Sequence, residues 1–422
     1  MVCATASVGL ALAFSVVPGS ADAATNSGSD SRPIPTQVFR EDSPFYQKLP
    51  DDTPKANNSD QLKAAFKRQA EQYYGSPGEP NIGVNYSEFA PALYISRNSD
   101  PVFDIKMWNC QEKTDPNWAA EVSEMLKGVH IPADMIPDQS SDGSVSIYNE
   151  DTGVVVDMWQ TRKNPQGQWE ACWGGKIDNA KESIGTFPDG YGASASGLSQ
   201  LAYTIRHQEM VNGEINHIIA VGLPEITAWP AANWPANRTD GSYTGVAITM
   251  GQIMRLPADL DIDAMKLSPA ARTIAKAAQD YGIMLTETSG SVSIGAENYI
   301  SLQSNSYEEV FRGRWPNLEM AGDPARGEVP FPVDQLEFLP LGYRAPLNNT
   351  GPKGPPPTGN PNLPTPEATP TAEPADPTPT AEAPEEDGES SGVSWVLPVV
   401  GLAVLLAAGG AFALVKTRGR GA

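Results

Sequence analysis

Short stretches of apolar or alternating residues recur along the middle of the chain, and turn-forming residues separate them. The turn sequences include DG at 142–143, DTG at 151–153 and NPQG at 164–167. Short strands at this spacing are typical of a sandwich or barrel. The pattern predicts strands at residues 92–95, 101–108, 144–148, 154–161 and 168–173. We therefore expect a mainly β fold with a few helices, an antiparallel, jelly-roll-like β-sandwich.

Three stretches favour helices instead: residues 117–127, 197–210 and 269–281. In the last of them, Ser268 is a typical N-cap, Pro269 suits the first turn and Gly282 ends the helix. Its apolar stripe consists of Ala270, Ile274, Ala277 and Tyr281. After it, we expect a hairpin in which residues 283–286 pair with residues 291–295.

The longest apolar run lies near the C-terminal end, at residues 393–415, and carries no charge. A run of this length can cross the hydrocarbon core of a bilayer as a helix. The basic residues Lys416, Arg418 and Arg420 follow it, so residues 416–422 are expected to form a cytoplasmic tail. This pattern predicts a single-pass protein of the cell membrane, with an extracellular ectodomain and a cytoplasmic C-terminus.

A shorter apolar run at residues 7–17 precedes the small-residue sequence ADA at 21–23. This is typical of a secretory signal peptide, here residues 1–23, although no Lys or Arg precedes the run. A buried N-terminal helix is the alternative interpretation. A true start upstream, with Met1 a misassigned start codon, would explain the missing basic residue.

Two polar segments flank the expected folded part. Residues 345–392 are rich in Pro, Thr, Glu and Ala, a composition that buries no core and favours an extended stalk. Residues 24–60 are also polar and rich in Pro and Asp, so we predict a disordered arm there. The β-rich extracellular domain is then expected at residues 61–344. This layout looks like a wall-associated surface protein of the Gram-positive, actinobacterial type.

The net charge and the cysteine content limit the classes of partner and cofactor that the protein can be expected to bind. The formal net charge of −22 disfavours nucleic acid as a partner. Cys3 belongs to the predicted signal peptide, which leaves Cys110 and Cys172 for a disulfide in an oxidising compartment. Two unpaired buried thiols are the alternative. The sequence contains no metal-binding spacing of Cys or His, so we expect no metal and no cofactor.

A series of motifs runs through the expected folded part: WGG at 173–175, GYGASASGL at 190–198, GEINHIIAVGLPE at 213–225, WPANRTDG at 234–241, the run at 254–285 and FPVDQL at 331–336. Together these motifs resemble an uncharacterised family of secreted bacterial proteins. The resemblance covers roughly residues 80–340 and implies an extracytoplasmic, β-rich domain. It implies no particular reaction, because no chemistry is established for that family.

The predicted hairpin at 154–173 offers a candidate binding surface. With its turn at 164–167, Trp159 would lie opposite Cys172, and Thr161 opposite Glu170. Asp157, Trp159, Thr161 and Glu170 would then share one face. An aromatic ring can stack on a sugar, and carboxylates can accept bonds from its hydroxyls or act as an acid/base pair. Asp157 and Glu170 as solvated strand residues are the alternative.

Two further candidates follow in the sequence. His217 could act as a general base or bind sugar, although it precedes the apolar strand sequence IIAVGL, where a core histidine is common. The loop at 229–241 could bind ligand through Trp229 and Trp234. Arg238 and Asp240 could clamp a ligand there, or form an ion pair that pins the loop.

These observations predict a membrane-anchored extracellular protein that binds glycan, such as a cell-wall or extracellular polysaccharide. The catalytic candidates Asp157, Glu170 and His217 extend this to possible polysaccharide cleavage. The alternative is a non-catalytic surface adhesin, or a structural protein that spans the wall.

Overall fold

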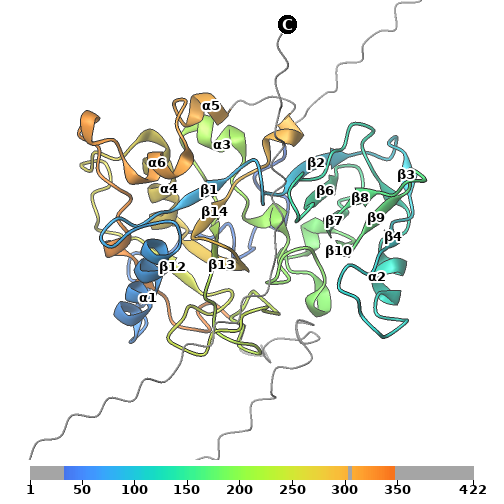
Figure 1. The fold of residues 1–422 in the computed structure, drawn as a ribbon, viewed down its shortest axis with the longest axis horizontal. Coiled ribbons are helices and arrows are strands. Elements are labelled where there is room, and N and C mark those ends of the chain that lie inside the picture. Colours follow the sequence, from blue (N-terminus) through green and yellow to red (C-terminus); the bar gives the residue numbers. More distant parts are fainter. Residues whose placement is uncertain (1–32, 303–306, 347–422) are drawn as a thin grey trace, which may run out of the picture. The chain divides into compact units, whose positions relative to one another are not determined.

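The computed structural model describes residues 33–302 and 307–346 (Figure 1). Within them the protein is mainly β with few helices, and none of its sheets closes into a barrel. The predicted signal peptide, transmembrane helix and basic tail, and all of the stalk beyond residue 346, lie outside these residues. The described part contains no helix that is both long and apolar enough to cross a bilayer.

The larger sheet has six strands in the order β1-β14-β11-β13-β12-β15. These are β1 (Gly83–Asn85), β14 (Ser293–Gly295), β11 (Ile219–Leu223), β13 (Ile283–Thr288), β12 (Ile253–Arg255) and β15 (Glu337–Phe338). The sheet is mixed, since β1 and β14 are parallel, as are β11 and β13, while β12 pairs antiparallel with β13 and β15. All five residues of β11 are buried, as expected for a strand covered on both faces.

The second sheet has four strands in the order β10-β7-β6-β2. These are β10 (Trp173–Ile177), β7 (Val155–Trp159), β6 (Val145–Asn149) and β2 (Ala92–Ser96). Two smaller sheets lie in the same part of the chain. One pairs β3 (Val102–Phe103) with β5 (Val129–His130), and the other has the order β4-β9-β8, with β4 (Lys106–Met107), β9 (Trp169–Ala171) and β8 (Arg162–Lys163).

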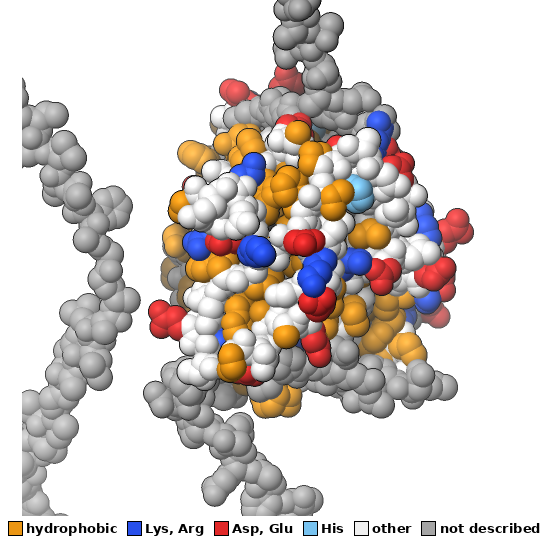
Figure 2. All heavy atoms as spheres, turned by 90° about the vertical axis from the view of Figure 1, so that its right-hand side faces the viewer, with side chains coloured by type: hydrophobic (Ala, Val, Ile, Leu, Met, Phe, Trp, Pro, Cys, Tyr) orange, Lys and Arg blue, Asp and Glu red, His pale blue; other side chains and the backbone are white. Residues whose placement is uncertain are grey.

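This half of the molecule keeps apolar surface. Figure 2 shows hydrophobic side chains exposed at several places on one face, with Lys, Arg, Asp and Glu side chains between them. Basic side chains lie over aromatic rings here, with Arg162 3.7 Å from the ring centre of Trp108 and Lys163 4.6 Å from that of Trp169. Such contacts cover part of the aromatic surface with a charged group that stays in water.

The helices are short, apart from two. The α-helices are α1 (Ser59–Gln72), α2 (Ala120–Met125), α3 (His207–Asn212), α4 (Pro269–Asp280), α5 (Tyr307–Val310) and α6 (Pro316–Ala321). Short 3-10 turns occur at Ala180–Glu182, Pro188–Gly190, Gln200–Ala202, Tyr299–Leu302, Pro324–Arg326 and Val333–Gln335.

Helix α4 forms as its sequence predicts. The Ser268 side chain accepts a hydrogen bond from the Ala271 backbone N–H, 3.1 Å away, and Pro269 takes the first turn. The chain leaves the helix at Gly282, whose φ of +92° is a left-handed conformation that glycine adopts freely. The predicted strands 92–95 and 144–148 are likewise confirmed as β2 and β6.

Three local predictions are wrong. Residues 197–210 are not one helix, but a 3-10 turn at Gln200–Ala202 and then α3. Strands β13 and β14 do not form a hairpin with each other, because β11 lies between them and pairs with both. The strand pairing is not antiparallel throughout, since β1–β14, β11–β13, β2–β6 and β4–β9 are parallel.

The predicted disordered arm at 24–60 is also wrong for its described part, residues 33–60. Phe39, Phe45 and Tyr46 are buried in the main hydrophobic core, and Ser59 begins helix α1. Burying a large aromatic side chain contributes about 1.5–3 kcal/mol, which offsets part of the entropy cost of ordering the segment. The prediction failed because it was based on the average polar composition of the segment, to which these few buried aromatic residues contribute little.

The predicted disulfide between Cys110 and Cys172 is present, with the two Cα atoms 5.6 Å apart. It connects the segment after β4 to the single residue between β9 and β10. The two cysteines are 62 residues apart in the sequence. Closing a loop of this length restricts the unfolded chain strongly.

We expect replacement of both cysteines by serine to lower the free energy of unfolding by about 4 kcal/mol, because the unfolded chain regains loop entropy. Urea denaturation of the oxidised wild type and the double variant measures this difference. Reduction of the wild type with dithiothreitol is the control and should reproduce the loss. Equal midpoints for oxidised and reduced protein would contradict the prediction.

Candidate functional site

The register of β7 and β10 decides which side chains meet. Trp159 lies opposite Trp173, and Asp157 lies opposite Gly175. The predicted pairing of Trp159 with Cys172 is wrong by one residue, because the chain changes from the β4-β9-β8 sheet to the β10-β7 sheet at Cys172. Directly opposed residues share a face, so Trp159 and Trp173 lie on the same side of the sheet.

Trp173 is the centre of an aromatic platform, which we define as Trp118, Trp159, Trp173 and Tyr191. Its ring stacks on Trp118, with centroids 6.1 Å apart, and contacts Tyr191 at 5.9 Å. All four residues keep partial solvent exposure. The Lys113 ammonium group lies 4.8 Å from the ring centre of Trp173 and 5.2 Å from that of Trp118.

A loop of small residues at 190–196 carries Tyr191 to the platform. The Gly192 N–H donates to the Gly174 carbonyl oxygen, 3.1 Å away, which fixes the loop against β10. A Cβ atom on Gly175 would lie only 2.5 Å from the Gly192 nitrogen, so this approach requires glycine. Arg238 holds the other side of the loop by donating to the carbonyl oxygens of Gly192 and Ser194, each at 3.1 Å.

The same loop connects the platform to strand β13. The Ala195 N–H donates to the Glu287 carboxylate at 2.9 Å, and the Ser194 hydroxyl donates to the Thr286 carbonyl oxygen at 3.1 Å. Glu287 therefore points toward the loop from the larger sheet. Its neighbour Thr288 donates from its hydroxyl to the Asp240 carboxylate at 2.6 Å.

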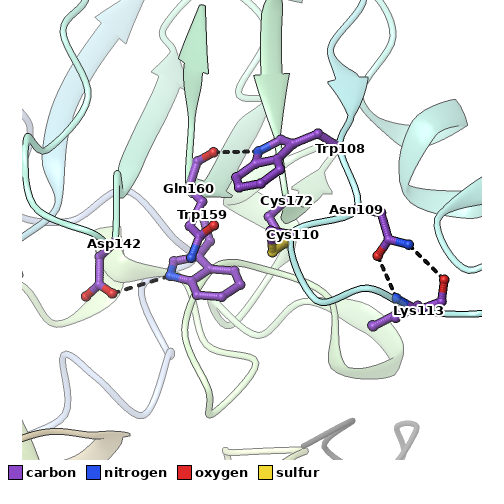
Figure 3. Close-up of a disulfide and its surroundings, with 8 residues drawn as sticks. All are labelled: Trp108, Asn109, Cys110, Lys113, Asp142, Trp159, Gln160 and Cys172. Carbon is purple, nitrogen blue, oxygen red and sulfur yellow. Dashed lines mark hydrogen bonds between the residues drawn. A yellow bond between two sulfur atoms is a disulfide. The ribbon is translucent and has the colours of Figure 1, made fainter. Parts of the chain in front are cut away.

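A third carboxylate reaches the site from the turn before β6. The Trp159 indole N–H donates to Asp142 at 3.4 Å, and Figure 3 shows the ring directed toward that carboxylate beside the disulfide. The backbone of this turn is fixed as well, since the Gln160 N–H donates to the Asp142 carbonyl oxygen at 2.7 Å. We refer to Asp142, Asp240 and Glu287 as the carboxylate cluster.

Burial raises the pKa of all three of these carboxyl groups and so favours their protonated forms. Glu287 is half-buried as a residue, but protein atoms crowd its carboxyl group. Burial raises its pKa well above the usual range, and the negative charge of Asp240 adds to this, against the Ala195 hydrogen bond and Arg238. Burial also raises the pKa of Asp142, and the hydrogen bond from Trp159 opposes the shift.

The basic group Lys113 has a lowered pKa. Burial lowers the pKa of Lys113, and the nearby positive charge of Arg238 lowers it further. The site thus combines aromatic faces, carboxyl groups that take up protons more readily than usual, and two basic groups. Such an arrangement can bind hydroxylated ligands by stacking and hydrogen bonding.

Trp159, Arg238 and Asp240, which the sequence singled out, meet at this site. Arg238 and Asp240 do not bind each other, however, because Arg238 donates to backbone carbonyls and Asp240 accepts from Thr288. Arg238 therefore does pin a loop, although its partner there is backbone.

Trp229 and Trp234 each precede a cis-proline in the loop at 229–241. Trp229 is 39% exposed and Trp234 is half-buried. Within the residues that the structure describes, no hydrogen bond or ring contact joins either side chain to the platform or the carboxylate cluster.

Asp157 and Glu170 do not form a pair. Asp157 is fully buried, and its carboxylate accepts a hydrogen bond from the Gln200 N–H at 2.8 Å and from the Ser199 hydroxyl at 3.4 Å. Glu170 belongs to another sheet and accepts bonds from Arg162 and Asn164 at 3.3 and 3.0 Å. Both the catalytic pairing and the solvated alternative are thus wrong for Asp157, since its strand face is covered by the turn at 199–200.

His217 is also fully buried. Its Nε2 atom lies 3.0 Å from a carboxylate oxygen of Glu209, and its Nδ1 atom lies 2.7 Å from the Ile218 carbonyl oxygen. Both ring nitrogens therefore have protein partners. This matches the core histidine that the apolar strand β11 favours, with a carboxylate as an additional partner.

The site includes residues that the sequence reading did not select. The sequence predicts Asp142 in a turn and Trp118 in the helix at 117–127, and Glu287 directly follows the predicted strand 283–286. The available signal was the glycines of the WGG and GYG motifs, which mark a close approach of two backbones. In the described residues, no group of three or more His, Cys, Asp or Glu side chains is arranged to hold a metal ion.

The buried Asp157 should make stability depend on pH. Burial raises its pKa to about 7, so the folded state holds a proton that the unfolded chain releases near pH 4. The stabilisation is complete below pH 4 and is lost as the pH rises to 7. Between pH 5 and pH 8 the wild type should lose on the order of 3 kcal/mol of its free energy of unfolding through this group. We expect Asp157→Asn not to show this decrease, because the amide does not titrate.

Urea denaturation of wild type and variant at both pH values measures that difference. Asp178→Asn is the control, because the Asp178 side chain is 86% exposed, and it should keep the wild-type dependence. If wild type and Asp157→Asn lose the same stability over this range, Asp157 is not the responsible group.

Comparison of the chain with protein-family models, with curated proteins and with solved structures finds no match. The resemblance to a family of secreted bacterial proteins thus stays an expectation from the sequence motifs.

Proposed function

We propose that the described domain binds glycan through the aromatic platform and the carboxylate cluster. The observation that carries this proposal is the placement of partly exposed Trp159 and Trp173 beside Asp142, whose carboxylate lies 3.4 Å from the Trp159 nitrogen. Sugars offer an apolar C–H face and a rim of hydroxyl groups. A ring next to hydrogen-bonding carboxyl groups complements both features.

The two ends of the chain supply the argument for the cellular location of this domain. We propose that residues 393–415 anchor the protein in the cell membrane and that residues 345–392 form a stalk, so that the domain faces the cell wall. A secreted wall-associated protein of this type meets polysaccharide at high density. Against the alternative of a non-catalytic adhesin that contacts other proteins, we favour glycan because the platform combines aromatic rings with hydrogen-bonding groups.

Cleavage of the bound glycan is a second candidate function. The raised pKa of Glu287 favours it, since a glycosidase needs one carboxyl group that keeps its proton near neutral pH. Glu287 would donate this proton to the glycosidic oxygen of the leaving sugar. Asp142 would accept a proton from the water that attacks the anomeric carbon.

We expect Trp159→Ala in the full-length chain to weaken polysaccharide binding at least tenfold, or about 1.4 kcal/mol, because the stacking surface is lost. Trp159→Phe should retain most of the affinity, since it keeps an aromatic face. Pull-down and titration with soluble polysaccharides measure both variants.

Trp229→Ala is the matched control, because Trp229 is a partly exposed tryptophan in another loop. Its affinity should equal that of the wild type. An equal loss for Trp229→Ala and Trp159→Ala would place binding elsewhere, and a wild type that binds no polysaccharide would contradict the proposed function.

Cleavage is tested separately with Glu287→Gln. If the domain hydrolyses glycan, we expect this substitution to lower turnover by two orders of magnitude or more, with binding retained, because the amide cannot donate an acidic proton. Reducing-end release from the polysaccharide that binds best gives the rate. Equal rates for the wild type and the variant would remove Glu287 from the mechanism.

A further inference from the structure

A separate groove lies at the edge of the larger sheet, where strand β1 is the outermost strand. Its volume is about 340 Å³, within the range of roughly 300–1,000 Å³ for small-molecule sites. Three segments contribute to it: the turn after α1, strand β1 and the start of α6. The lining residues are Tyr74, Asn81, Gly83, Val84, Asn85, Pro316 and Asn317, none of which belongs to the platform or the carboxylate cluster.

Tyr74 occupies an unusual position on this groove. It follows the C-cap Tyr73 of α1 and has a φ of +68°, the left-handed conformation that glycine usually supplies at the end of a helix. A bulky side chain is unfavourable in this conformation. The Tyr74 ring is also 82% exposed, so it contributes little to the hydrophobic core.

A strained and exposed aromatic residue suggests a role other than folding. A glycine at position 74 would end the helix with less strain, and no buried contact would be lost. The tyrosine instead places a ring at the wall of a groove, where a ligand can cover it.

The asparagine side chains supply polar groups of both kinds. Asn317 donates from its amide to the Asn81 carbonyl oxygen at 3.1 Å, which holds the two amides together. Asn85 donates to the Phe89 backbone oxygen at 3.4 Å. These bonds leave the carbonyl oxygens of Asn85 and Asn317 as acceptors and the amide nitrogen of Asn81 as a donor.

The lining contains no charged side chain, although the whole chain carries a net charge of −22. A carboxylate or phosphate ligand would therefore find no cation in the groove, and the net charge would repel it. A cationic ligand would find no carboxylate there. The chemistry that remains is that of a neutral ligand with hydroxyl groups and an apolar face.

We propose that this groove binds a neutral saccharide, with the sugar ring stacked on Tyr74 and its hydroxyl groups bonded to Asn81, Asn85 and Asn317. An aromatic ring beside amides that both donate and accept hydrogen bonds is complementary to a pyranose. The volume of the groove suits a short oligosaccharide. This site does not depend on the platform, so the two proposals can fail independently.

The test uses the full-length chain in the Trp159→Ala background, which weakens the platform by removing one of its four aromatic rings. Short neutral oligosaccharides of glucose, mannose and N-acetylglucosamine are titrated and followed by tyrosine fluorescence and by saturation-transfer NMR. We expect at least one of them to bind, with Tyr74→Gly weakening it tenfold or more and Tyr74→Phe retaining it. The melting temperature of Tyr74→Gly should equal or exceed that of its parent, because the left-handed position then carries glycine.

Asn317→Asp is a second variant, because it introduces a negative charge into the groove and removes an amide. It should weaken binding without unfolding the domain. The proposal is overturned if none of these saccharides binds, or if Tyr74→Gly and Asn317→Asp bind as tightly as the parent. A lower melting temperature for Tyr74→Gly would show that the ring stabilises the fold, and would also count against it.

Discussion

The close packing of the loop at 190–196 against strand β10 is the constraint on which the candidate site depends. The loop can lie there because Gly175 and Gly192 bring two backbones together where a Cβ atom would not fit. It then carries Tyr191 onto the face of Trp173 and presents the Ala195 N–H to Glu287. One steric feature thus joins an aromatic surface on the four-stranded sheet to a carboxylate on the six-stranded sheet.

The chain that follows this loop covers a neighbouring part of the same strand face, since Asp157 lies opposite Gly175. Ser199 and Gln200 cover β7 and give the buried Asp157 its hydrogen bonds. A carboxyl group in such a place is stabilised chiefly in its neutral form, which explains why its pKa rises to about 7. Asp157 and Trp159 share a face of β7, but residues 199–200 cover Asp157, whereas Trp159 points toward Asp142.

The sequence correctly predicts features that depend on neighbouring residues or on residue type, such as the ends of a helix and the disulfide. Ser268 and Gly282 mark the ends of α4, and Cys110 and Cys172 form the predicted bridge. The register of β7 was missed because it depends on where the chain changes sheets, at Cys172. The order of the larger sheet was missed because β11, far earlier in the chain, inserts between β13 and β14. Glu287 and Asp142 could not be paired from the sequence, since only tertiary packing brings their segments together.

The charges of the site favour neutral or hydroxyl-rich ligands over anions. The positive charge of Arg238 acts on Glu287, but its hydrogen bonds go to the carbonyl oxygens of Gly192 and Ser194. It therefore lowers the pKa of Glu287 only through its field, and burial together with Asp240 outweighs it. Proton uptake is then the available way to relieve the repulsion among the carboxyl groups. A protonated Glu287 can donate a hydrogen bond that a carboxylate cannot, and a sugar hydroxyl or glycosidic oxygen is a suitable acceptor.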